Sequence, residues 1–235
     1  RPEDPSASDG EIHTHYHHPN ETTGDRFEFV HSATITWDGR YMTVQDETGG
    51  GGTAECDGSA PEGTPPGATS DGFTYIYERV DPGEPAPPPL SRYMIPRPQG
   101  AEICVSHNGN VIPTMTGYYQ TQAFYQGGNT VLDFTDPTRP REIAFSDPTG
   151  DAIGDADSWS TYWYNDHIYA NGGLDRRGPT RNRGLDVFRL ADEDGDFFRT
   201  RKFHHLNPQT QEVEQTVGDD GSNNNPTRQP GDGIQ

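Results

Sequence analysis

"NTVLDFTDPTRPREIAFSD", residues 129–147, holds the pattern that decides the fold of this chain. A short apolar run leads into Asp-Pro-x-x-Pro, and a second short apolar run follows it. Proline fixes its own backbone φ, and the aspartate side chain caps the backbone that follows, so the motif forms a tight turn. The stretch therefore predicts two antiparallel strands joined by this turn.

The same pattern occurs earlier, as "FTYIYERVDPGEPAPPPLSRYMIP" at residues 73–96. Each pair of strands is preceded by two more strand candidates: residues 29–39 and 40–47 in the first round, and residues 104–113 and 118–128 in the second. A third round comprises residues 158–172 and 183–192, without the Asp-Pro turn. The chain thus repeats a unit of about four strands in roughly 50 residues, the size of a propeller blade.

The repeat predicts an all-β fold of about three four-stranded β-propeller blades. A blade buries its two faces against neighbours on either side, so three blades leave two faces to be covered. We expect the chain to be part of a larger propeller, completed by other blades or by another protein chain. Helical periodicity is missing, which argues against an α/β fold, and a β-sandwich is the alternative.

Composition agrees with short strands and long loops. The 235 residues include 28 Gly and 21 Pro, the two poorest helix formers, and only 29% are hydrophobic. The 11 Tyr, 10 Phe and 3 Trp supply bulky side chains for a core. We expect residues 1–27 to form an extended His-rich arm, residues 28–191 the blades, and residues 192–235 a loop and a polar C-terminal tail.

The net charge of −20 narrows the choice of partners. A strongly acidic surface repels nucleic-acid phosphates and anionic membranes, so we predict neither nucleic-acid binding nor membrane insertion. No apolar run approaches the ~20 residues of a membrane span. No phosphate-binding loop or nucleophile motif is present either, which predicts no nucleotide cofactor and gives no support to nucleophilic catalysis.

Five segments carry a resemblance to a known family: "HSATITWDGRYMTVQDETGGGG", "ICVSHNGNVIP", "FYQGGNTVLDFTDPTRPREIAFSDP", "STYWYNDHIYA" and "RGLDVFRL". In this order they resemble the C-terminal half of the secreted LVIVD-repeat β-propeller proteins. The resemblance implies secretion and a propeller of six or seven blades, of which this chain holds three. The sequence is also distantly similar to the selenium-binding-protein propellers, in which histidines hold a metal.

The two cysteines are too few for a disulfide scaffold or for a zinc site made of four thiolates. The LVIVD-repeat pattern has one cysteine in the Gly-rich loop and another before the His-Asn pair. Cys56 and Cys104 match both positions, so the resemblance supports a disulfide between them. Such a bridge would stabilise the fold by about 4 kcal/mol and implies an oxidising compartment.

His31 and His107 occupy matching places near the start of a round. The first strand of a propeller blade lines the central channel, so both imidazoles could face one site, and Glu47 or Asp46 could add a carboxylate. Imidazole and carboxylate together suit a transition metal. The alternative is structural: strand alternation places both histidines on apolar faces, where backbone carbonyls between blades would satisfy them.

Two further sets of side chains suggest cations. Asp155 and Asp157, or the acidic loop at residues 191–197, could supply oxygen ligands to calcium, although solvated acidic turns explain them equally well and the twelve-residue calcium loop is absent. His13, His15 and His17 would share one face of an extended strand and could hold Zn²⁺ or Cu²⁺. A flexible arm that packs over a partner is the alternative for this histidine tract.

Tyr125, Gln126, Trp159 and Tyr162 stand near predicted strand ends, where such side chains bind sugars or peptides at a propeller mouth. Packing between blades is the alternative role for these aromatic rings. The leading functional hypothesis is a secreted acidic β-propeller segment that acts as a binding or assembly module. The other is a metal-dependent hydrolase or oxidoreductase whose channel site uses His31, His107 and Glu47.

Overall fold

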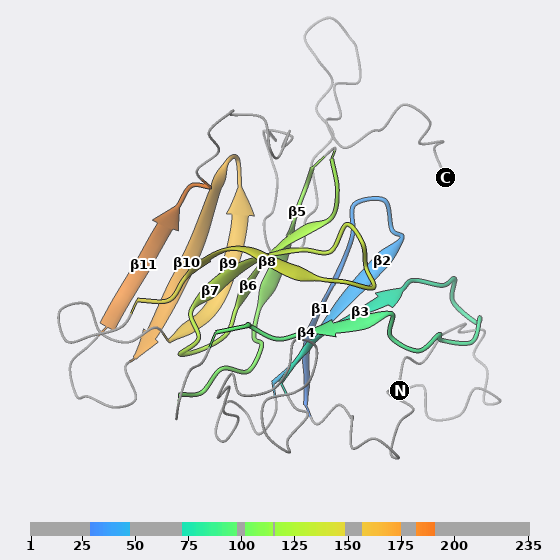
Figure 1. Ribbon diagram of the computed structural model, residues 1–235, viewed down its shortest axis with the longest axis horizontal. Helices are drawn as coiled ribbons and strands as arrows, with labels where there is room; N and C mark the ends of the chain where they lie inside the picture. The colour runs from blue at the N-terminus through green and yellow to red at the C-terminus, as the bar shows by residue number, and fades with distance from the viewer. Residues whose placement is uncertain are drawn as a thin grey trace, which may run out of the picture.

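The computed structural model describes residues 29–47, 72–97, 102–114, 116–148, 157–174 and 182–190. Over these residues the protein is all-β: it consists of eleven strands in three antiparallel sheets and contains no helix (Figure 1). The prediction of an all-β fold is therefore confirmed. No helix in the described part of the chain is long and apolar enough to cross a bilayer.

Strands that are neighbours in the sequence are neighbours in each sheet. The first sheet comprises β1 (Val30–Ile35), β2 (Tyr41–Asp46), β3 (Thr74–Glu78) and β4 (Ser91–Tyr93). The second comprises β5 (Gly109–Ile112), β6 (Tyr119–Ala123), β7 (Asn129–Asp133) and β8 (Arg141–Ser146). The third comprises β9 (Ser158–Tyr164), β10 (His167–Leu174) and β11 (Asn182–Phe188). All eleven lie within or overlap the predicted strand ranges.

The Asp-Pro-x-x-Pro turns connect antiparallel strands, as predicted. In the turn between β7 and β8, the amide of Thr138 donates to Oδ1 of Asp136 at 3.0 Å, and the amide of Arg139 donates to the Asp136 carbonyl at 3.0 Å. Hydrogen bonds from the hydroxyl and amide of Thr138 hold the pKa of Asp136 below its usual value. The corresponding turn between β3 and β4 has a Glu84 amide bond to the Asp81 carbonyl.

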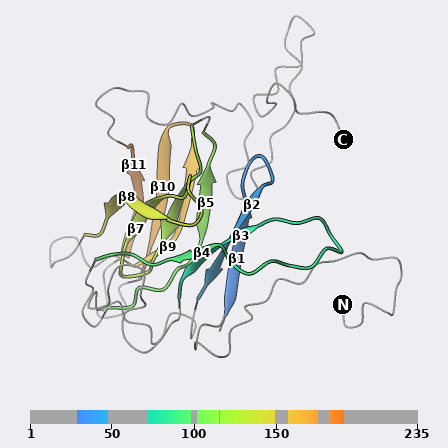
Figure 2. The same ribbon diagram turned by 45° about the vertical axis from the view of Figure 1, so that its right-hand side comes forward.

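The second sheet lies between the other two (Figures 1 and 2). An apolar cluster fills each interface. Between the first and second sheets, Tyr41 and Ile76 pack with Phe124 and Leu132, among others. Between the second and third sheets, the main buried members are Ile112, Tyr119, Val131, Trp163 and Ile168. Every residue of β7 is buried because both faces of its sheet are covered. The described residues therefore form three packed sheets, whereas the alternative prediction of a β-sandwich would have two.

The first strands of the three sheets, β1, β5 and β9, lie next to one another at one edge, and the later strands of each sheet lie further from this edge. Strand β1 contacts β5, and β5 contacts β9. The hydroxyl of Thr34 on β1 lies 3.4 Å from the carbonyl of Gly109 on β5, and Asn108 forms a parallel β-bridge with Ser160 on β9. This edge, where the first strands meet, is also where the candidate site lies.

A buried chain of polar side chains crosses the first interface. The hydroxyl of Thr43 donates to Oε1 of Gln120 at 2.7 Å. On the first sheet, the Thr43 hydroxyl accepts a hydrogen bond from Gln45, whose side-chain oxygen accepts one from Ser32. On the second sheet, Gln120 donates to Gln122, which donates to the carbonyl of His107. A buried amide or hydroxyl without a hydrogen-bond partner lowers the stability of the fold. This series of hydrogen bonds therefore favours one relative position of the two sheets.

Several predictions concern residues outside the described ranges: the arm at 1–27, the tail at 192–235, the histidine tract, Asp155 and the acidic loop at 191–197. Cys56 also lies outside these ranges. Cys104 is fully buried and is not a free thiol. The disulfide between Cys56 and Cys104 stays a prediction.

Candidate metal site at the junction of the three sheets

Three side chains form the one group among the described residues that could hold a metal ion: His31, Glu47 and His107. The Nε2 atom of His31 lies 3.5 Å from Oε2 of Glu47, and Nε2 of His107 lies 3.5 Å from Oε1. Metal bonds of 2.0–2.2 Å in tetrahedral geometry place neighbouring ligand atoms about 3.3–3.6 Å apart. The two nitrogen–oxygen separations are therefore compatible with ligands that share a metal.

His31 reaches the site because β1 contains a bulge. Its pairing with β2 shifts register between Val30 and Ser32, which makes His31 the extra residue. A bulge changes the direction of a side chain relative to simple alternation. The apolar face that alternation assigns to His31 is not buried either, because Phe29 and Ile35 are exposed. Strand alternation therefore does not describe the direction of the His31 side chain, and a structural role stays the alternative to metal binding.

Glu47 follows the last residue of β2, and its amide donates to the Phe29 carbonyl at 2.8 Å. The neighbouring Asp46 was the other candidate carboxylate. Its Oδ1 accepts the Phe29 amide at 2.8 Å, so Asp46 fixes the end of the hairpin. The carboxylate that faces the two imidazoles is that of Glu47, of which only 8% is exposed.

His107 lies two residues before β5 and is 5% exposed in its side chain. Its Nδ1 bonds the backbone carbonyl of Trp159, which belongs to β9. A carbonyl only accepts hydrogen bonds, so this contact is formed by the tautomer that carries its hydrogen on Nδ1. In that tautomer the lone pair lies on Nε2, the nitrogen that faces Glu47, which is the arrangement typical of metal-binding histidines. The third sheet thus orients a side chain at the site.

Tyr125 completes the surroundings of Glu47 by donating its phenolic hydrogen to Oε1. The residue has a backbone φ of 42°, which non-glycine residues rarely adopt, in the turn between β6 and β7. Two backbone hydrogen bonds with Ser158, of 3.0 and 2.8 Å, hold this turn against the third sheet. The Tyr125 ring lies edge-on to that of His107, with centroids 4.9 Å apart. Tyr125 was predicted to contact a sugar or peptide ligand, but its hydrogen bond to Glu47 was not predicted.

The four residues predicted to bind sugars or peptides separate into different environments. Trp159 lies beside His107 and Tyr125, and 41% of it is exposed. Gln126 is buried, and its side-chain oxygen accepts the Ile103 amide at 2.8 Å. Thr161 and Trp163 lie on the face of β9 that packs against the second sheet. Tyr162, which pairs with Tyr169 of β10, lies on the other face and points away from the second sheet. The structure therefore brings Tyr125 and Trp159 to the His–Glu–His group but not Tyr162.

Asp157, the second residue of the predicted calcium pair, is buried just before β9. Its carboxylate is not part of the His31, Glu47 and His107 group. Calcium binding at Asp155 and Asp157 stays a prediction, because Asp155 lies outside the described residues.

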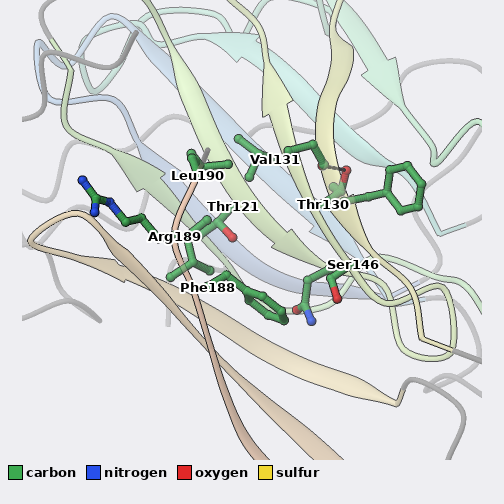
Figure 3. Close-up of a pocket in the computed structure, with 11 residues that line it drawn as sticks. Thr121, Thr130, Val131, Ser146, Phe188, Arg189 and Leu190 are labelled. Carbon is green, nitrogen blue, oxygen red and sulfur yellow. Dashed lines mark hydrogen bonds between the residues drawn. The ribbon is translucent and has the colours of Figure 1, made fainter. Parts of the chain in front are cut away.

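A pocket of about 160 Å³ lies apart from this group, between the second and third sheets (Figure 3). It is lined by the second sheet, with Thr121 and Val131 among others, and by Phe188 at the end of β11 with the two residues that follow it. Its lining is mostly apolar and shares no residue with the His–Glu–His group.

No protein-family model and no curated protein matches this chain. The geometry of the described residues therefore carries the functional argument.

Proposed function

We propose that this chain is a β-propeller segment that holds a transition-metal ion between His31, Glu47 and His107. The observation that carries the proposal is the meeting of two imidazoles and one carboxylate, at ligand spacing, on the edge where the first strands converge. Two histidines and a carboxylate suit zinc and iron(II) better than calcium.

Matched positions in the three sheets support the propeller architecture. Thr34 pairs with Thr43, Asn110 with Thr121, and Ser160 with Asn171, in each case between the first two strands of a sheet. We call these pairs the matched row. The first-strand members of the matched row are Thr34, Asn110 and Ser160. The residues three positions before them are His31, His107 and Asp157. Each sheet thus has an ionisable side chain three residues before its matched row, within β1 in the first sheet and just before β5 and β9 in the other two, as repeated blades would have.

Hydrogen bonding around two of the three ligands, His107 and Glu47, favours a metal over a purely structural cluster. His107 is oriented by the Trp159 carbonyl, and Glu47 is oriented by the Tyr125 hydroxyl. Such second contacts fix the direction of the ligand atoms and commonly tune metal affinity. The Nδ1 of His31 is buried and has no hydrogen-bond partner among the described residues, so this ring lacks the kind of second contact that orients His107.

The arrangement supports metal-dependent catalysis, either hydrolytic or oxidative. Three protein ligands leave at least one coordination position for water or substrate, which distinguishes catalytic metal sites from closed structural ones. A bound zinc ion would supply an activated water, whereas a bound iron(II) ion would supply oxidative chemistry. Trp159 is partly exposed beside the ligands and is placed to contact whatever enters.

A binding or assembly role is the second candidate, and the third sheet favours it because β11 exposes large aliphatic side chains. In this proposal the three blades are completed by other blades or by a partner chain. The resemblance to the secreted LVIVD-repeat propellers supports the same architecture and an extracellular location.

Metal analysis of the purified full chain tests the proposed function. We expect dialysis against trace zinc or iron(II) to leave about one transition-metal ion per chain, and His107→Ala or Glu47→Gln to abolish this retention. His167→Ala is the matched control because His167 is the first residue of β10 and lies outside the metal-binding group. Retention that is unchanged in His107→Ala, or no retention by the unmodified chain, would reject the metal centre.

A further inference from the structure

The matched row continues onto the third strand of each sheet, where it ends in an aliphatic residue. Ile76 lies opposite Thr43, Val131 opposite Thr121, and Leu185 opposite Asn171. Two residues before the second-strand member, each sheet has a tyrosine: Tyr41, Tyr119 and Tyr169. The same set of side chains therefore forms one face of all three sheets.

In the first two sheets this face packs against the next sheet. Ile76 is 0% exposed and Val131 is 4% exposed, each within an apolar cluster that includes residues of the following sheet. The row also forms side-chain hydrogen bonds across each interface: Thr43 to Gln120 at 2.7 Å, and Thr121 to Thr161 at 2.8 Å. This face is thus a docking surface that the chain uses twice.

In the third sheet the equivalent face is exposed. Leu185 is 64% exposed, and its neighbours Val187 and Asn171 are also exposed. Val187 pairs with Tyr169, and Tyr169 pairs with Tyr162, so two aliphatic and two aromatic side chains share the surface. Figure 1 shows this sheet at the end of the series, with β11 outermost. The residues of a docking surface are present, but no sheet among the described residues covers them.

We propose that Tyr162, Tyr169, Leu185 and Val187 form a docking face for a fourth β-sheet that lies outside these 235 residues. The inference rests on the propeller architecture proposed above and identifies the face and the kind of partner. From the two interfaces already present, the partner sheet presents an apolar cluster, such as Phe124 with Leu132 or Trp163 with Ile168. It also presents a hydroxyl or amide side chain toward Asn171, as Gln120 and Thr161 do toward their rows.

A second copy of this chain is a poorer occupant. To repeat the packing between sheets within the chain, the second copy would have to pack its first sheet against the docking face. The surface in contact would be the face of that first sheet that points away from its own second sheet. Val44, Tyr75 and Tyr77 form that face, and all three are already buried within the chain. That face is therefore covered before any second copy arrives.

Site-specific photo-crosslinking of the full chain in the organism that produces it tests the docking face. A benzophenone amino acid replaces Leu185 in one variant and Ile35 in the control, since Ile35 is an exposed aliphatic residue on β1. Mass spectrometry then identifies the linked peptide. We expect position 185 to link to a β-strand segment outside these 235 residues, and Val187→Asp to lower this yield at least tenfold.

Three outcomes would overturn the proposal: a link from position 185 to a second copy, a link to this chain's own residues, or equal yields from positions 185 and 35. Metal retention by the crosslinking variant is measured in parallel. If retention persists while crosslinking fails, the docking face is rejected and the metal centre stands.

Discussion

The phenolic hydroxyl of Tyr125 donates to the carboxylate of Glu47, which lies 78 residues earlier in the chain and belongs to another sheet. The turn that carries Tyr125 also bonds Ser158 of β9 through both backbone groups. One residue therefore links a group from the first sheet, a turn from the second and a strand from the third. The candidate metal site depends on the relative position of all three sheets.

Tyr125→Phe keeps the ring beside His107 but removes the hydrogen bond to Glu47. We expect metal affinity to fall by about tenfold or more, because loss of a group that orients a ligand typically weakens binding by that factor. Competition titration with a chromophoric chelator measures the change. Tyr162→Phe is the control, since Tyr162 lies on the face of β9 that points away from the second sheet. An equal loss of metal affinity in both variants would contradict the role assigned to Tyr125.

Gln120→Leu interrupts the buried polar chain between the first two sheets. It leaves the Thr43 hydroxyl and the Gln122 side-chain oxygen without their observed partner, and the free energy of unfolding should fall by about 1–3 kcal/mol. Urea denaturation measures this loss. A double-mutant cycle with Thr43→Val should show coupling, whereas strictly additive losses would mean that the bond does not join the sheets. Val30→Ala on the exposed edge should change stability by less than about 0.5 kcal/mol.

Equivalent aliphatic residues in the first and third sheets should respond differently to truncation. Ile76→Ala removes a fully buried side chain between two sheets and should cost about 2–5 kcal/mol of unfolding free energy. Leu185→Ala should cost less than about 0.5 kcal/mol in the isolated chain, because Leu185 is mostly exposed. Thermal and urea unfolding test both. A large loss from Leu185→Ala would show that this face is already covered.

The contact between Tyr118 and Asp38 predicts a pH dependence of stability. The Tyr118 hydroxyl lies 2.6 Å from Oδ2 of Asp38. Partial burial, together with the bond and the charge of Asp38, raises the pKa of Tyr118 to about 12. Folding therefore favours the neutral phenol, and this contribution is complete below the ordinary pKa of about 10 and is lost as pH rises toward 12.

At acidic pH the same contact acts through Asp38. Partial burial opposes ionisation, but hydrogen bonds from Tyr118, Thr36 and the Arg40 amide outweigh it and hold the pKa of Asp38 below its usual value. Its contribution is present above the ordinary pKa of about 4 and is lost as pH falls through the lowered folded value. Urea unfolding from pH 2 to 12 should show that Tyr118→Phe reduces both losses. Parallel profiles of variant and unmodified protein would contradict the assignment.

Much of the fold could be predicted because its signals are local. Proline and aspartate determine the turns that join β3 to β4 and β7 to β8, and strand-length apolar runs surround each turn. The matching places of His31 and His107 were visible for the same reason, since they depend only on the order of the repeats. Glu47 was a candidate because it ends a predicted strand.

The remaining features depend on long-range geometry. The bulge at His31 breaks the alternation on which its predicted direction depended. Tyr125 reaches Glu47 only because its backbone adopts a left-handed conformation, for which an aromatic residue gives no sequence signal. The polar chain did leave a signal: the runs at residues 43–45 and 120–122 place threonine and glutamine in the middle of strands, where such side chains require buried partners.

Anomalous X-ray diffraction from crystals of the full chain, recorded at the absorption edges of zinc and iron, tests the central claim most directly. We predict one strong peak about 2.0–2.2 Å from Nε2 of His31, Nε2 of His107 and a carboxylate oxygen of Glu47. The three sheets should surround this peak as blades about one axis. Direct hydrogen bonding of the two histidines to Glu47 with no anomalous peak, in crystals grown with both metals, would contradict the account.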